Sequence, residues 1–158
     1  MAEDSIRVRR ATVADAETVA AFNIAMAEET ENLRLDPERA SHGARSGLTA
    51  VDHAAYYMAE TAGRTVGQLM VTTEWSDWRN GFWWWIQSVY VTPDHRRRGV
   101  FRRLYLHVRE LARARPDVCG LRLYVHRENE RAIDTYRGMG MALTSYLVCE
   151  EMWIGEHC

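Results

Sequence analysis

The stretch VYVTPDHRRRGVFRRL at residues 89–104 decides the fold that this sequence predicts. An apolar strand stops at Pro93, three arginines follow, and an amphipathic helix begins at Gly99. The first turn of a helix carries backbone N–H groups without helical partners and the positive end of the helix dipole. Such a turn can bind phosphate, and Gly99 lets a phosphate approach because it has no Cβ. The stretch therefore predicts an anion-binding turn between a buried strand and a helix.

The elements on either side of this stretch are clearly marked. Residues 82–92 (FWWWIQSVYVT) are almost wholly apolar without alternation, which is typical of a central strand covered on both faces. Asn80-Gly81 predicts a hairpin that joins this strand to an earlier one at residues 65–74. Downstream, apolar residues recur at helical spacing from Gly99 to Arg115, and Pro116 follows.

The remaining segments complete an α/β domain. Thr12 and Asp15 form an aspartate variant of the capping box, and Asp36-Pro37 marks a second helix start. The other expected elements are strands at residues 6–10, 53–60 and 121–125, helices after Thr12, from 37 to about 48 and at 129–137, and one or two final strands at 141–154. Hairpins followed by a strand–helix–strand unit predict a mixed sheet with a right-handed parallel crossover. Because the sequence has no repeat or proline-rich linker, residues 1–158 are expected to form one domain.

Composition argues against several classes of protein. The net charge of -2 gives no general attraction to nucleic acid or to an anionic membrane. No apolar run approaches the roughly 20 residues that a membrane helix needs, and the first ten residues lack the apolar stretch of a signal peptide. Cys119, Cys149 and Cys158 form no CxxC pair, which argues against a zinc site or a disulfide framework. We therefore expect a cytoplasmic protein that binds no metal, nucleic acid or membrane.

A second motif lies downstream, at another strand-to-helix junction. It consists of Val125, Asn129, Ala132, Tyr136 and Gly140. Asn129 and Tyr136 are seven residues apart, which is two helical turns, so both lie on one helix face. Together with the arginine-rich stretch, and in the same order along the chain, this motif resembles the GNAT superfamily of N-acetyltransferases. The resemblance runs from the first strand to the last.

The arginine-rich stretch resembles the acetyl-CoA signature of that family. The family pattern is Gln or Arg, two variable residues, Gly, a variable residue, and then Gly or Ala. The residues from Arg96 to Val100 fit this pattern, whereas Phe101 departs from it at the last position. The backbone N–H is retained there, but the large side chain has to turn toward the core rather than toward a pyrophosphate.

The resemblance implies a fold, a cosubstrate and a set of contacts. The implied fold is α/β, with a mixed, mostly antiparallel central sheet that contains a splayed parallel strand pair and is flanked by four helices. The implied reaction transfers an acetyl group from acetyl-CoA to a primary amine in a ternary complex. The implied cofactor-binding residues are Val89, Tyr90, Val91, Arg96, Arg97, Arg98, Gly99, Val100, Phe101, Arg102, Asn129, Ala132 and Tyr136. A backbone N–H near Val89 would polarise the thioester carbonyl, and Tyr136 would protonate the leaving thiolate.

The acceptor side is less defined by the sequence. The family often has a glutamate on the central strand as general base, but here Gln87 and Ser88 occupy the strand and could only hold a water. Glu28, Glu29, Glu31 and Glu74 are the alternative bases, and an acidic wall would suit a cationic amine. The candidate substrate-binding residues are Asn23, Glu28, Trp85 and Gln87. The tryptophans at 75, 78 and 83–85 pack in the core, form a homodimer contact, or line an aromatic acceptor wall.

The sequence leaves open several alternatives for the acceptor and for the function. The acceptor is a small-molecule amine in the leading interpretation, and a protein lysine or N-terminus in the second. A third interpretation is a regulatory module that binds acyl-CoA without catalysis, for which the missing strand glutamate is the only support. A nucleic-acid interpretation rests on the arginine run alone, while the rest of the chain is acidic.

Overall fold

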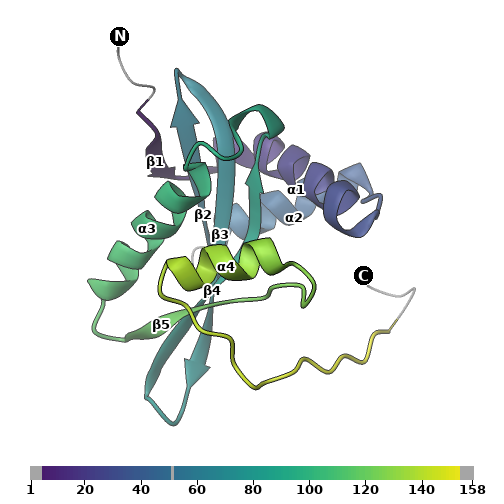
Figure 1. Ribbon diagram of the computed structural model, residues 1–158. Helices are drawn as coiled ribbons and strands as arrows, with labels where there is room; N and C mark the ends of the chain where they lie inside the picture. The colour runs from purple at the N-terminus through teal and green to yellow at the C-terminus, as the bar shows by residue number, and fades with distance from the viewer. Residues whose placement is uncertain (1–4, 51, 154–158) are drawn as a thin grey trace. The chain divides into compact units, whose positions relative to one another are not determined.

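The computed structural model describes residues 5–50 and 52–153 (Figure 1). Contacts within the chain separate it into two compact units, Met1–Tyr124 and Val125–Cys158. The first unit contains β1 (Arg7–Arg10), η1 (Val13–Asp15), α1 (Ala16–Glu31), α2 (Pro37–Thr49), β2 (Ala54–Thr61), β3 (Arg64–Ser76), β4 (Gly81–Val91), η2 (Pro93–His95), α3 (Val100–Arg113) and β5 (Val118–Leu123). The second unit contains α4 (Glu130–Gly138).

The five strands form one sheet in the order β1-β2-β3-β4-β5. Neighbouring strands are antiparallel, except that β4 and β5 are parallel. The parallel pair is joined through α3, because parallel strands need a long crossover. This confirms the predicted mixed, mostly antiparallel sheet with a parallel strand pair and four helices.

The parallel pair separates along its length. Backbone pairing of β4 with β5 runs from Phe82↔Val118 to Ile86↔Leu123, whereas β4 continues to Val91. Within the described residues, the β5-facing edge of β4 is therefore without a strand partner from residue 87 to residue 91. An open edge of this kind can pair with another extended chain.

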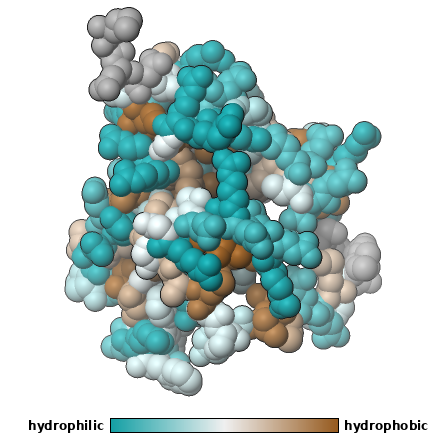
Figure 2. Space-filling view, viewed as in Figure 1, coloured by the Kyte–Doolittle hydropathy of each residue, from teal (hydrophilic) through white to brown (hydrophobic). Residues whose placement is uncertain are grey.

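Helices cover the two faces of the sheet. On one face, Tyr56 and Met58 pack against Val19, Ala20 and Ala44 of α1 and α2. On the other face, the ring of Tyr57 meets that of His107 of α3 edge-on, with 5.4 Å between centroids. The core-facing side of α3 buries Val100, Leu104, Tyr105, Val108 and Ala112. The face of the molecule drawn in Figure 2 is mostly hydrophilic, with hydrophobic residues in small separate groups.

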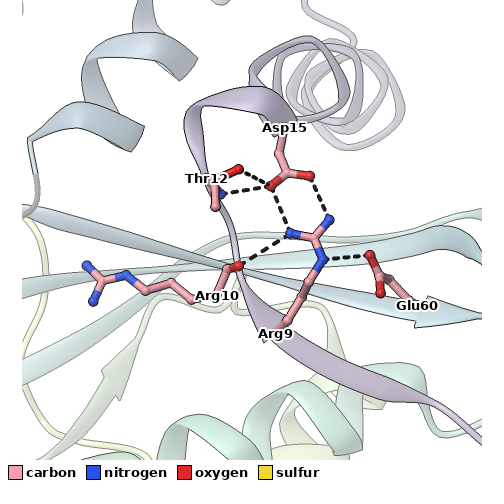
Figure 3. A network of polar contacts seen from close by, with 5 residues as sticks. All are labelled: Arg9, Arg10, Thr12, Asp15 and Glu60. Atoms are coloured by element: carbon pink, nitrogen blue, oxygen red, sulfur yellow. Dashed lines mark hydrogen bonds and ion pairs between the residues drawn. The ribbon is translucent and has the colours of Figure 1, made fainter.

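An ionic network fixes the start of α1 to the first two strands (Figure 3). Arg9 of β1 donates to both carboxylate oxygens of Asp15, at 2.8 and 2.7 Å, and to Glu60 of β2 at 2.6 Å. Asp15 also accepts the backbone N–H of Thr12 at 2.8 Å, so the predicted aspartate cap is present. The hydrogen bonds from Arg9, together with the cap bond from Thr12, hold the pKa of Asp15 below its usual value of 3.8.

Some predicted element limits differ from the structure. The strand predicted at 121–125 runs instead from Val118 to Leu123, because the ladder with β4 ends at Leu123. The strands predicted at 141–154 are wrong over residues 141–153, which contain no strand, and residue 154 lies outside the described residues. Their apolar run includes Tyr146, Leu147 and Val148, all exposed. Such a run becomes a strand only when a neighbouring edge supplies its hydrogen bonds, and the described residues of this unit contain no strand that could do so.

No helix of the described residues is both long enough and apolar enough to span a bilayer. Cys119 and Cys149 are exposed free thiols.

The end of the β3–β4 hairpin projects past α1 and α2 (Figure 1), and it carries Trp75 and Trp78 with 58% and 85% of their surfaces exposed.

The network around Asp15 predicts a pH-dependent contribution to stability. Asp15→Asn should lower the free energy of unfolding by about 1–3 kcal/mol at pH 7, because it removes charge-assisted hydrogen bonds at a mostly buried carboxylate. The carboxyl group has a lowered pKa in the folded state, so its stabilisation is present above pH 3.8 and is lost as the pH falls through the folded-state pKa. Urea unfolding at pH 7 and below pH 3 measures the difference.

Asp117→Asn is the matched control, because Asp117 pairs with Arg115 on the exposed surface. It should change the free energy of unfolding little at either pH. Two results would contradict the assignment of this stabilisation to the ionised Asp15 carboxylate. One is an equal loss in the free energy of unfolding from Asp15→Asn and Asp117→Asn at pH 7. The other is a loss from Asp15→Asn that is as large below pH 3 as at pH 7.

Candidate functional site

The turn before α3 is built to leave backbone donors without helical partners. Gly99 is the N-cap of α3 with φ 80, a left-handed conformation that glycine adopts without steric cost. The first helical bond runs from Arg103 N to Gly99 O at 3.0 Å. The N–H groups of Val100 and Arg102 lie in the first turn of α3, ahead of that bond, where the helix itself supplies no acceptor. A Cβ on Gly99 would meet no atom within 4 Å, so the space beside this turn is open to a ligand.

The three arginines of the turn have different surroundings. Arg96 donates to the carbonyl of Val91 at 2.9 Å and to Glu29 of α1 at 2.5 Å, and its guanidinium lies over the ring of Tyr90. Tyr90 also donates to Glu29, at 3.3 Å. Arg96 therefore connects α1 to the end of β4. Arg97 and Arg98 are exposed, and Arg97 takes a left-handed φ of 64.

Close packing brings β3, β4 and the start of α3 together. A Cβ on Gly67 would lie 2.9 Å from the carbonyl oxygen of Tyr90 and 3.0 Å from the side chain of Val100. Only glycine fits at this position of β3 without a shift of the neighbouring chain. Phe101 is partly buried and its ring centroid lies 6.2 Å from that of Tyr105, so its side chain runs along α3.

A β-bulge changes the direction of β4 just beyond the residue at which its pairing with β5 ends. Gln68 pairs with Tyr90 and Met70 pairs with Gln87, so Ser88 and Val89 together oppose one residue of β3. Ser88 takes a left-handed φ of 49, which is uncommon for a residue other than glycine. The bulge lies within residues 87–91, the part of β4 that is paired with β3 but has no partner in β5. Val89 and Val91 belong to this part.

The second unit holds the downstream motif. Asn129 is the N-cap of α4, and its side-chain oxygen accepts the N–H of Ala132 at 3.1 Å. This bond uses the oxygen only, so the amide nitrogen of Asn129 takes no part in the cap. Tyr136 is partly buried, and this burial raises the pKa of its hydroxyl above 10.0.

The sheet face covered by α1 and α2 gathers the residues predicted for the acceptor. Gln87 donates to Thr72 at 2.6 Å, and Trp85 donates to Glu74 at 2.7 Å. Register places these four side chains on the same face as Tyr56 and Met70. Glu28 is exposed at the far end of α1.

The aromatic side chains of this face already have partners within the chain. Trp85 stacks on Tyr124 with 4.5 Å between ring centroids. The guanidinium of Arg122 lies 4.0 Å from the ring centre of Trp83 and bonds Glu74 at 3.2 Å. Arg79 lies 5.1 Å from the same ring centre. A cationic acceptor at Trp83 would have to compete with these arginines.

One residue of the site was missed from the sequence. Gln68 of β3 is fully buried, and its amide nitrogen donates to Asn23 of α1 at 2.8 Å and to the carbonyl of Ser88 at 3.2 Å. Its carbonyl oxygen has no hydrogen-bond partner among the described residues, which costs about 1–3 kcal/mol for a buried group. A glutamine in the middle of an apolar strand was the signal that could have identified it. Within the described residues, no three His, Cys, Asp or Glu side chains cluster as metal ligands.

Comparison with known proteins identifies the family. The model of the acetyltransferase (GNAT) family matches residues 18–141. The chain belongs to this family. The GNAT match covers the sheet from β2 to β5, the turn at Gly99 and the whole of α4.

Solved GNAT-like structures extend the match. A possible acetyltransferase from Clostridium difficile 630 is 37% identical, with a TM-score of 0.88, and the alignment covers 95% of this chain and 99% of that one. A ribosomal-protein-alanine N-acetyltransferase from Brucella melitensis biovar Abortus 2308 is 19% identical, with a TM-score of 0.73, over 93% and 100% of the chains. An aminoglycoside acetyltransferase from an uncultured soil metagenomic sample is 14% identical, with a TM-score of 0.73, over 95% and 97%. The search of curated proteins found no match.

Family membership makes the chain an acetyl-CoA-dependent N-acetyltransferase. The open turn at Gly99 fits the pyrophosphate of that cosubstrate, since an anion needs N–H donors without helical acceptors and room to approach them.

The turn predicts the effect of a side chain at Gly99. Gly99→Glu should weaken acetyl-CoA binding about 100-fold or more, because it adds bulk and negative charge where the phosphates would lie. Isothermal titration with acetyl-CoA, and with dephospho-CoA and ATP for comparison, measures the loss.

Gly63→Glu is the matched control. Gly63 also has a left-handed φ, of 72, and a Cβ there would meet no atom within 4 Å, but it lies in the β2–β3 turn. Both variants carry the same kind of backbone strain and the same added charge, so only Gly99→Glu should lose affinity. Retained affinity in Gly99→Glu would place the cosubstrate elsewhere.

Proposed function

We propose that this enzyme transfers the acetyl group of acetyl-CoA to a primary amine of a small molecule, by direct attack in a ternary complex. The observation that carries the proposal is the bulged edge of β4 at residues 87–91, which has no strand partner on its β5 side within the described residues. After η2 and the three arginines, the chain reaches the open turn at Gly99. The edge suits an extended pantetheine arm, and the turn suits the pyrophosphate at its end.

The chain offers separate groups for each part of acetyl-CoA. The N–H groups of Gly99, Val100 and Arg102, with the exposed Arg97 and Arg98 beside them, would bind the pyrophosphate. Arg96 would act indirectly, because its side chain is bonded to Val91 and Glu29. The backbones of Val89, Tyr90 and Val91 would hold the arm. Acetyl-CoA supplies the activated thioester.

The N–H of Val89 is the donor proposed for the thioester carbonyl. It belongs to the bulge, where the strand no longer faces a partner in β5. A fixed backbone donor at such a position costs no reorganisation when negative charge develops on the oxygen. Removing one donor of this kind from an enzyme typically costs about 10²–10³ in kcat.

Two proton transfers remain for side chains. Tyr136 would donate to the leaving sulfur, and the burial that raises its pKa keeps the hydroxyl protonated throughout the neutral range. The amine would lose its proton through a water held beside Gln87 or Ser88. Gln87 uses its amide nitrogen to bond Thr72, which orients its carbonyl oxygen as an acceptor.

The acceptor would lie on the sheet face of Asn23, Trp85 and Gln87. Glu29 is already paired with Arg96, so Glu28 and Glu31 are the carboxylates of α1 proposed to attract an amine. The rings of Trp83 and Trp85 are already stacked with side chains of the chain itself. This favours a contact between these rings and an uncharged part of the acceptor.

A protein acceptor is the second candidate, because a ribosomal-protein-alanine N-acetyltransferase and an aminoglycoside acetyltransferase both share this fold. Thiol release from acetyl-CoA distinguishes the classes when spermidine, kanamycin and free lysine are compared with peptides carrying an N-terminal alanine or an internal lysine. Faster release with a small amine supports the proposal, and faster release with a peptide overturns its acceptor. A homodimer through Trp75 and Trp78 remains a proposal that sedimentation tests.

Substitution of Tyr136 tests the proposed proton donor. Tyr136→Phe should lower kcat roughly tenfold or more with little change in acetyl-CoA affinity, in line with the range for general acid–base groups. The kcat ratio of wild type to variant should stay level from about pH 7 to 9. It should fall as the pH rises through the raised pKa of the hydroxyl, above 10.0.

Tyr146→Phe is the control, because Tyr146 lies in the same unit with 75% of its surface exposed. It should leave kcat unchanged. Equal kcat values for wild type and Tyr136→Phe would assign the proton to water, and binding of acetyl-CoA without turnover of any amine would favour a regulatory module.

A further inference from the structure

Gln68 is a buried polar residue of β3 whose side-chain hydrogen bonds reach two other elements, α1 and β4. Thr61 and Gln68 are the two polar residues buried within the described part of the chain, and each has a buried side-chain oxygen without a partner. An apolar side chain of similar shape would avoid the unpaired oxygen that Gln68 leaves in the core. The amide nitrogen is the part of Gln68 that makes contacts.

Both N–H groups of that amide are directed at other elements. One donates to the side-chain oxygen of Asn23 on α1, at 2.8 Å, and one to the backbone oxygen of Ser88 on β4, at 3.2 Å. Because the Ser88 carbonyl can only accept, the nitrogen of the Gln68 amide must be the atom that faces it. Gln68 thus holds α1, β3 and the bulge of β4 to one another.

The bond to Ser88 fixes the direction of the next backbone donor. The described peptide bonds contain no cis form, so the Ser88–Val89 peptide is trans and planar. In such a peptide the carbonyl of Ser88 and the N–H of Val89 point in opposite directions. With the carbonyl held toward the Gln68 amide, the N–H of Val89 is aimed away from that amide.

The bulge needs such a restraint. Ser88 has a left-handed φ of 49, and a residue with a side chain keeps this conformation only when its surroundings impose it. The Gln68 amide is a donor, within the described residues, that reaches the carbonyl of that peptide. Without it, rotation of the Ser88–Val89 peptide would turn both groups together.

We infer that Gln68 is a positioning residue, whose buried amide orients the Val89 N–H by holding the Ser88 carbonyl and ties this geometry to α1 through Asn23. The catalytic role of the Val89 N–H rests on the proposed function. The orientation of this N–H by Gln68 does not depend on the proposed function. Asn23 also bonds the hydroxyl of Tyr56, so the restraint on the bulge extends into the core under α1.

Gln68→Met tests the inference in the free enzyme and in turnover. Methionine has a similar length and no donor, so the Val89 amide signal in a ¹⁵N–¹H correlation spectrum should shift and broaden without any ligand. With acetyl-CoA and the best amine of the panel above, kcat should fall about tenfold or more, and KM for acetyl-CoA should stay within about twofold.

Thr61→Val is the matched control, since it also removes a buried polar group with an unpaired oxygen, but on β2 at the turn to β3. It should leave the Val89 signal and kcat unchanged. An unchanged Val89 signal in Gln68→Met would overturn the inference. A shifted signal with unchanged kcat would overturn its catalytic part, whereas a wild type that turns over no amine would overturn the proposed function instead.

Gln68→Glu gives a second measurement with nearly unchanged shape. The ionised carboxylate cannot donate, whereas the protonated acid can, and burial raises the pKa of such a group into an accessible range. As the pH falls, the Val89 signal of Gln68→Glu should move toward its wild-type position, while that of Gln68→Met should not. A Val89 signal in Gln68→Glu that does not titrate would overturn the proposed role of the donor.

Discussion

Backbone hydrogen bonding along β4 is the constraint on which the rest of the first unit depends. The strand is paired on its β3 side up to Val91 but on its β5 side only up to Ile86. Unpaired backbone groups inside a protein are costly unless a partner or water satisfies them. An edge that is left open beside a helix N-terminus is therefore a place where an extended ligand can supply the missing bonds. We propose that acetyl-CoA, the cosubstrate of GNAT enzymes, is the ligand that supplies them here.

The surrounding structure maintains this open edge. Gly67 allows the end of β4 and the first residue of α3 to approach β3 closely, and Arg96 ties the end of β4 to Glu29 of α1. The bulge at Ser88 is held from the β3 side by Gln68. The geometry of the edge is thus set by contacts from β3, α1 and α3 together, rather than by the local sequence of β4 alone.

Much of this arrangement could be predicted from local patterns. Periodicity, the capping residues and the Asn-Gly turn predict most of the helices and strands, because these signals depend on neighbours in the sequence. The turn at Gly99 was predicted for the same reason. A glutamine in an apolar strand marks Gln68 as unusual, but the bulge and the partners of Gln68 could not be predicted. They depend on cross-strand register and on a contact with Asn23, 45 positions away. The strands expected over 141–153 were wrong because an apolar run does not specify the edge with which it must pair.

Amide hydrogen exchange along β4 tests the central claim most directly. Exchange is measured residue by residue, with and without CoA, and the amides of residues 82–86, already opposite β5, are the internal reference. If the open edge receives the cosubstrate, CoA should slow exchange selectively within residues 87–91 and at the first turn of α3, with little change in residues 82–86. Protection confined to other segments, with residues 87–91 unchanged when CoA is bound, would contradict this claim.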